Sequence, residues 1–168
     1  MVSIADSVVI VKISGRATFH SSLDFKTLIQ ELRNRGHERF LLDLRDCLVM
    51  DSTFLGVLAG LGQRLTAAPG AGEHSRMKLM CPSPRVSDLL ENLGVTHLFN
   101  MVNGFPTVPQ SFEAVAPAAG QPSKEEISRT CLEAHLTLMD LNPANIPKFK
   151  DVTRFLAEDL EKGKAGQK

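Results

Sequence analysis

Short apolar segments alternate along much of this chain with longer segments whose apolar residues recur every three or four positions. The short segments are rich in β-branched and aliphatic residues and predict β-strands. A spacing of three and four places apolar side chains on one face of an α-helix. Alternation of this kind favours helices packed on a mostly parallel sheet, with the short connections of one domain.

Strands and helices can be assigned to residue ranges from these patterns. Strands are predicted at residues 7–13, 40–44, 77–81 and 97–102, with a further short strand at 17–19. The helices have apolar faces within residues 23–32, 54–65 and 86–93. Ser21 or Ser22 is expected to cap the first helix and Gly36 to stop it. Residues 48–50 form a short apolar step, residues 69–72 close the second helix, and Gly94 ends the third.

The composition changes after residue 102. Residues 103–122 hold four prolines and several Ala and Gly, which is typical of a linker or a surface loop. Ser123 and Glu126 form a capping-box pattern that begins a helix, and a last helix starts near Pro147. We therefore expect a domain at 1–112, a linker at 113–122 and a helical hairpin at 123–162. The apolar faces of the hairpin either pack on the same chain, form a homodimer or bind another protein.

Charge and composition exclude several classes of function. Lys plus Arg number 19 and Asp plus Glu number 19, and Trp and Tyr are absent. Phosphate contacts need a basic surface and base stacking needs aromatic residues, so nucleic acid is not an expected partner. The widely spaced Cys47, Cys81 and Cys131 indicate a reducing compartment. With neither a signal-peptide pattern nor a long apolar window, we expect a cytoplasmic protein that is not integral to a membrane.

Metal and nucleotide sites are not predicted. The five histidines show no ligand spacing, and each is expected at the surface or at a loop end; they are His20, His37, His74, His97 and His135. Gly56, Gly60 and Gly62 fall inside an apolar helix, so close packing against the sheet explains them better than a nucleotide.

Catalytic groups are not predicted either. Asp43 and Asp46 lie at the end of a predicted strand and could be an acid–base pair, but a solvated strand end explains them equally well. Cys47 is interpreted as a buried inert thiol. The sequence therefore indicates a protein that is not an enzyme and has no cofactor.

Asp51, Ser52 and Thr53 separate two apolar segments. The oxygens of Asp and Ser side chains accept the free N–H groups of a first helical turn, so capping is one explanation. A regulatory hydroxyl at Ser52 is the other, and the residue pattern alone leaves both open.

Residues 41–61, LLDLRDCLVMDSTFLGVLAGL, resemble the central signature of the STAS domain family. In that signature an apolar strand ends in Asp, and Asp-Ser-Ser/Thr-Gly-Leu-Gly then opens a helix. The matching residues are Asp43, Asp51, Ser52, Thr53, Leu55 and Gly56. Phe54 stands where the family usually has Gly, and residues 15–18 replace an acidic motif. The resemblance covers about residues 5–112. It implies an α/β fold with a mixed sheet of four to five strands and packed helices, which the C-terminal helices extend.

The resemblance also implies a function, because the family includes bacterial anti-sigma factor antagonists. Their serine at the place of Ser52 is phosphorylated by a partner kinase that is also the anti-sigma factor, and a phosphatase reverses the reaction. Asp51 would then position Ser52, Thr53 would be a supporting or alternative hydroxyl, and Phe54 and Gly56 would belong to the partner surface.

Two other functions remain open. STAS domains also occur as scaffolds or accessory subunits of larger assemblies, including membrane-transport complexes, and these need no phosphorylation. A small enzyme or nucleotide-binding protein is the weakest alternative, because no catalytic constellation is present.

Overall fold

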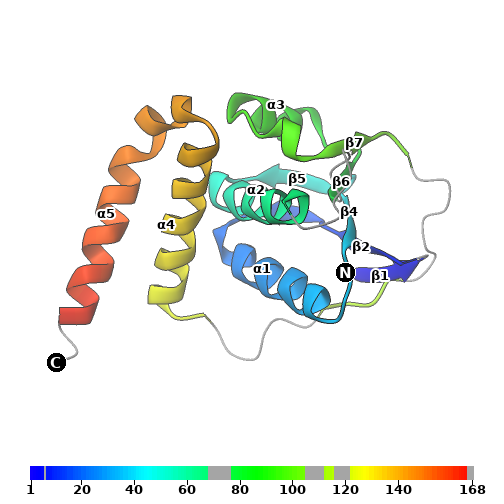
Figure 1. Ribbon diagram of the computed structural model, residues 1–168, viewed down its shortest axis with the longest axis horizontal. Helices are drawn as coiled ribbons and strands as arrows, with labels where there is room; N and C mark the ends of the chain where they lie inside the picture. The colour runs from blue at the N-terminus through cyan, green and yellow to red at the C-terminus, as the bar shows by residue number, and fades with distance from the viewer. Residues whose placement is uncertain (6, 68–76, 105–111, 116–121, 166–168) are drawn as a thin grey trace.

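The computed structural model describes residues 1–5, 7–67, 77–104, 112–115 and 122–165 (Figure 1). Its main sheet has five strands in the order β1-β2-β4-β6-β7. Their bounds are Val2–Ala5, Val8–Lys12, Arg39–Asp43, Met77–Met80 and Asn100–Val102. β1 runs antiparallel to β2, and every other neighbouring pair is parallel. The expected mixed α/β sheet is confirmed.

Three helices cover one face of this sheet. They are α1 (Phe19–Asn34), α2 (Ser52–Thr66) and α3 (Pro84–Asn92). Alternate strand residues such as Val9, Leu42 and Leu79 point to that face and form one core with the helices, because side chains along a strand alternate between faces. A smaller cluster around Ile10, Leu41 and Met80 lies on the opposite face.

A separate pair of short parallel strands brings two helix starts together. β3 (Gly15–Ala17) pairs with β5 (Cys47–Met50), and Ala17 lies opposite Met50. The N–H of Asp51 donates to the carbonyl of Ala17 at 3.0 Å, which extends the pairing to the residue before α2. The first turns of α1 and α2 therefore lie next to each other.

Local predictions were corrected at several places. The N-terminal strand β1 was not expected, and residues 48–50, expected as a step, belong to strand β5. Thr18 caps α1, while Ser21 sits in the first turn, where its hydroxyl completes the capping box. Residues 97–102 divide into the end of a 3-10 helix (Thr96–Leu98) and β7.

Parts of two other predictions lie outside the described residues. Residues 69–72, expected to close α2, are among them, as are residues 116–121 of the expected linker and residues 105–111 of the proline-containing segment before it. Within the described part of that segment, Glu113 forms an antiparallel bridge with Val2 at the sheet edge.

The C-terminal helices form the expected hairpin, α4 (Lys124–Leu141) and α5 (Ile146–Ala165), joined by the 3-10 turn Pro143–Asn145. The capping box of Ser123 and Glu126 is present. α4 packs on α1 and α2, and α5 lies outside it at the edge of the molecule (Figure 1). The hairpin thus packs on its own chain, while a homodimer stays a prediction. Within the described ranges, no helix combines the length and the hydropathy that crossing a bilayer requires.

Candidate functional site

Asp51 joins the starts of α1 and α2. One oxygen of its carboxylate, Oδ1, accepts the N–H of Phe54 at 2.8 Å, and the other, Oδ2, accepts the N–H of Phe19 at 2.8 Å. Asp51 is therefore the N-cap of α2, one of the two caps that the sequence allowed, and it also satisfies a backbone donor in the first turn of α1. This double contact fixes the backbone on which Ser52 stands.

Ser52 is the first residue of α2 and is partly exposed. Its Oγ lies 3.0 Å from Nε2 of His135, a residue of α4 that is 83 positions away in the sequence. The other ring nitrogen, Nδ1, lies 2.8 Å from the carbonyl oxygen of Cys131. A carbonyl oxygen only accepts, so Nδ1 donates, and the neutral imidazole leaves Nε2 to accept the Ser52 hydroxyl proton.

The environment of His135 favours this neutral form. The side chain is 7% exposed, and its ring centroid lies 4.7 Å from that of Phe149 on α5. Burial lowers the pKa of His135, and the Cys131 carbonyl and the Asp51 charge offset this only in part.

The remaining predicted partner residues face their own chain. Thr53 is buried, and its hydroxyl donates to the thiol of Cys131 at 3.7 Å. Phe54 is 2% exposed and packs against Phe25 in the core, with ring centroids 4.9 Å apart. Gly56 lies against Ala134 of α4 so closely that an added Cβ would stand 2.4 Å from the Ala134 carbonyl oxygen. The structure thus brings Thr53 and Gly56 together with α4, and it turns Phe54 away from the surface.

The glycines of α2 pack closely, but against different elements than expected. Gly56 faces Ala134, Gly60 faces Thr137 of α4, and Gly62 faces Phe99, so the contacts are with the hairpin and the loop before β7 instead of the sheet.

His135 was expected at the surface or at a loop end, and this prediction was wrong. It lies in mid-helix on the side of α4 that faces α2. Ser128, Cys131, His135 and Leu138 are spaced three, four and three apart, which is one helix face. A histidine on such a face is the signal that could have identified it.

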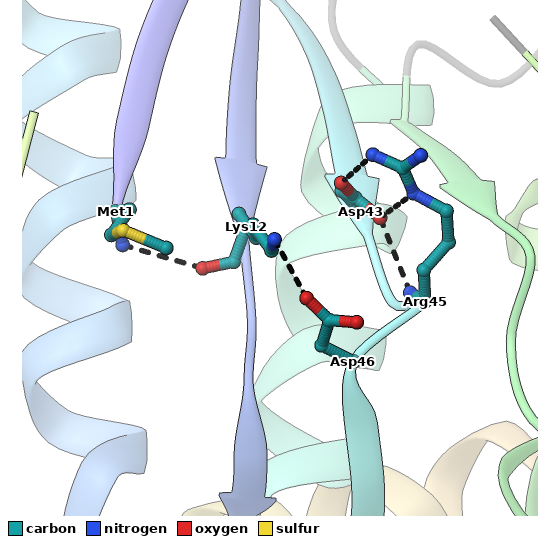
Figure 2. Close-up of polar contacts among 5 residues, drawn as sticks. All are labelled: Met1, Lys12, Asp43, Arg45 and Asp46. Carbon is teal, nitrogen blue, oxygen red and sulfur yellow. Dashed lines mark hydrogen bonds and ion pairs between the residues drawn. The ribbon is translucent and has the colours of Figure 1, made fainter. Parts of the chain in front are cut away.

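Figure 2 shows the polar contacts at the ends of β2 and β4. Oδ1 of Asp43 accepts from Nε of Arg45 at 2.9 Å, and Oδ2 accepts from Nη2 of Arg45 at 2.7 Å. Lys12 pairs with Asp46 at 2.6 Å. Asp43 is fully buried, which corrects the expected solvated strand end. Burial alone would raise its pKa, but the hydrogen bonds and charge of Arg45 bring the pKa below its ordinary value.

This arrangement explains Asp43 as a structural residue instead of a catalytic acid or base, because both carboxylate oxygens are occupied. Cys47 is buried as predicted, and burial raises the pKa of its thiol, so it is a poor nucleophile.

An open, largely apolar cleft of about 350 Å³ lies between β2, β3 and α1. Lys12, Arg16 and Phe54 are among the residues that line it, and Ser52 is not. Among the described residues, no group of three or more His, Cys, Asp or Glu side chains is arranged to hold a metal ion.

These observations define a small α/β domain. It has a mixed five-stranded sheet with helices on one face, and its second helix is capped by Asp51 and begins at Ser52. The family model described as "STAS domain" matches residues 1–111, and the chain therefore belongs to the STAS domain family. No curated protein matches the sequence.

Solved structures of similar fold are described as anti-sigma factor antagonists. A crystal structure of a candidate antagonist from Thermotoga maritima, TM1081, has a TM-score of 0.54 and 22% identity, covering 62% of this chain and 86% of that one. An NMR structure of TM1081 has a TM-score of 0.53 and 21% sequence identity, and the match covers 61% of this chain and 78% of that one. The structure of the antagonist SpoIIAA in its unphosphorylated form has a TM-score of 0.50 and 18% sequence identity, and the match covers 62% of this chain and 88% of that one. At these identities, the likeness concerns the fold.

Proposed function

We propose that this protein is an anti-sigma factor antagonist-like module, which binds a partner kinase that is also an anti-sigma factor and is switched by phosphorylation of Ser52. The observation that carries the proposal is the position of Ser52 as the first residue of α2, directly after a capping carboxylate and partly exposed. The family membership and the description of SpoIIAA by its phosphorylation state support the same role.

Phosphorylation at this position suits the physics of a helix start. A phosphate adds about −1.5 to −2 charge, and the N-terminal N–H groups and dipole of α2 favour an anion. The fold should therefore tolerate the modification. A partner surface that had met a neutral hydroxyl would meet a charge instead, and an unpaired buried charge costs several kcal/mol. One modification would thus dissociate a complex without unfolding either protein.

The rest of the proposal follows from the same role. Asp51 and Ser52, which are partly exposed, form the partner surface, and the buried Thr53, Phe54 and Gly56 support it from beneath. A serine phosphatase restores the hydroxyl. The regulatory domain ends near residue 112, residues 113–122 link it to the helical extension at 123–162, and the protein acts in the cytoplasm. It is a substrate of a kinase and not a catalyst.

Mass spectrometry of the protein purified from its own cells tests the site. Trypsin cleaves after Arg45 and Arg64, so one peptide carries Ser52 and Thr53 as its only hydroxyl residues. We expect phosphate on Ser52 in the wild type and in a Thr53→Ala control, and none in Ser52→Ala. Equal phosphorylation of the Ser52→Ala peptide, or no phosphate on Ser52 with an active partner kinase present, would refute the assignment.

A scaffold or accessory-subunit role is the second candidate, and one observation favours it. The Ser52 hydroxyl is already bonded to His135, which gives it a structural role without phosphate. Ser52→Asp separates the two candidates in a pull-down from the native cells. Unchanged recovery of partners would support a scaffold, and their loss would support the switch.

A further inference from the structure

The hairpin covers the surface around Ser52. Ser52, Gly56 and Gly60 are spaced four residues apart, so they lie along one face of α2, and α4 lies across this face. Gly56 allows the backbone of α4 to approach, since any Cβ at that position would overlap Ala134. Lys26 of α1 pairs with Glu133 of α4 at 2.7 Å beside the same groove. The groove therefore accepts a helix, and α4 occupies it.

The contact between Ser52 and His135 depends on a hydroxyl proton. Nε2 of His135 accepts that proton, because Nδ1 is committed as donor to the Cys131 carbonyl. A phosphate ester on Oγ has no such proton and presents acceptor oxygens towards the same nitrogen. Its bulk would also enter the space that the imidazole ring fills at 3.0 Å. Phosphorylation thus replaces the hydrogen bond between Ser52 and His135 by steric overlap and by repulsion between the phosphate oxygens and Nε2.

The start of α2 favours an anion, but the hairpin side of the contact offers the phosphate little compensation. The Asp51 carboxylate already lies at the same helix start, and Phe149 packs against the ring from α5. A protonated imidazole could pair with the phosphate, but burial lowers the pKa of His135 and so opposes protonation. Lys26 of α1, which lines the groove between α2 and α4, is already paired with Glu133.

We propose that the first complex controlled by Ser52 is intramolecular, and that phosphorylation of Ser52 undocks the α4–α5 hairpin from α2. The inference rests on the proposed function only in taking Ser52 as the modified residue. In the closed form, α4 occupies the groove that a helix of a partner would need. In the open form, the groove and the inner face of α4 both become available for other proteins.

The hairpin is attached in a way that permits its release. It contacts α1, α2 and the end of α3, and no strand of the five-stranded sheet is contributed by residues 124–165. At its far end, Asn145 donates to the carbonyls of Leu93 and Leu138, and Lys148 donates to the carbonyl of Asn92. These contacts hold the hairpin at its turn, while the phosphate acts against the middle of α4.

Hydrogen exchange on the full chain with phosphoserine encoded genetically at position 52 tests the proposal. We expect the amides of residues 128–138 to exchange at least about tenfold faster than in the unmodified chain, while β4 and β6 keep their protection. The matched control carries phosphoserine at Ser83, the N-cap of α3, whose hydroxyl accepts from its own helix. This control adds the same charge at a helix start and should leave α4 protected.

Two results would overturn the inference. Unchanged protection of α4 with phosphoserine at position 52 would show that the phosphate does not act on the hairpin. Loss of protection in β4 and β6 together with α4 would show that the hairpin is an integral part of the fold and not a displaceable cover. Because the phosphate is installed directly, neither result depends on whether cells phosphorylate Ser52, which the peptide analysis decides separately.

Discussion

Replacing Gly56 by Ala should disturb the docking of the hairpin without changing the Ser52 hydroxyl. An added Cβ at position 56 would lie 2.4 Å from the Ala134 carbonyl oxygen, 2.7 Å from its carbonyl carbon and 2.8 Å from its Cβ. Ordinary contact begins at 3.4 Å, so the backbone of α4 must move by about 1 Å to relieve the overlap. A backbone cannot rotate away as a side chain can, so the whole helix has to shift.

The size of the effect follows from two opposing contributions. Overpacking of a well-packed interface costs about 1–3 kcal/mol, while Ala in place of Gly stabilises a helix interior by about 1 kcal/mol. Gly60→Ala is the matched control, because an added Cβ there meets Thr137 at 3.5 Å, which is an ordinary contact. The helix contribution is common to both variants. Their difference in unfolding free energy therefore isolates the steric cost, about 1–3 kcal/mol.

Urea unfolding and hydrogen exchange measure this difference. We expect Gly60→Ala to be at least as stable as the wild type, and Gly56→Ala to be less stable than Gly60→Ala. In Gly56→Ala, the amides of α4 should lose protection before those of β4 and β6. Two variants within about 0.5 kcal/mol of each other, with α4 equally protected in both, would refute the close contact between α2 and α4.

Three further predictions concern other contacts of the site. Asp51→Ala should lower the free energy of unfolding by about 2 kcal/mol, because two backbone N–H donors lose their acceptor. Asp51→Asn should lower it less, since the amide oxygen can still accept one of these hydrogen bonds. Equal losses in the two variants would contradict this prediction. Asn145→Ala should cost about 1–3 kcal/mol, because the fully buried amide of Asn145 bonds the carbonyls of Leu93 and Leu138, and unchanged urea unfolding would contradict it. Below about pH 6.5 the unfolded chain protonates His135 more than the folded chain does, so the unfolding free energy should fall as the pH drops through this range. His135→Gln should remove this contribution to the pH dependence of the unfolding free energy. An identical pH dependence in the wild type and the variant would refute the prediction.

The pH prediction depends on the groups that face the imidazole of His135. On α2 these are Ser52 and the Asp51 carboxylate, which favours the protonated form, and on α4 the Cys131 carbonyl does the same. α5 contributes the uncharged ring of Phe149. Burial outweighs these influences, and this sets the sign of the expected slope.

The fold was largely predictable, because short apolar segments indicate strands and an apolar spacing of three and four indicates helices, and both patterns are visible in the local sequence. The expected strands and helices of the domain, and the hairpin after Ser123, are present with small shifts at their ends. β1 escaped prediction because Val2–Ala5 is short, and its place is set by pairing with β2. The 3-10 turn at Thr96–Leu98 is likewise decided by local packing.

The candidate site was predictable only in part. The sequence by itself determined that a helix would begin at Asp51–Ser52 with one of these side chains as its cap, because capping depends on neighbouring residues, and the structure assigns the cap to Asp51. The partner of Ser52 is 83 positions away, and no local period could reveal which face of α4 meets α2. Gly56 shows the same limit, since a glycine in a helix indicates close packing but not the element that packs there. Only the tertiary structure decided that α4 packs beside Ser52. The relative placement of two helices is set by which of their apolar faces are buried against each other, and the local sequence of either helix does not specify that pairing.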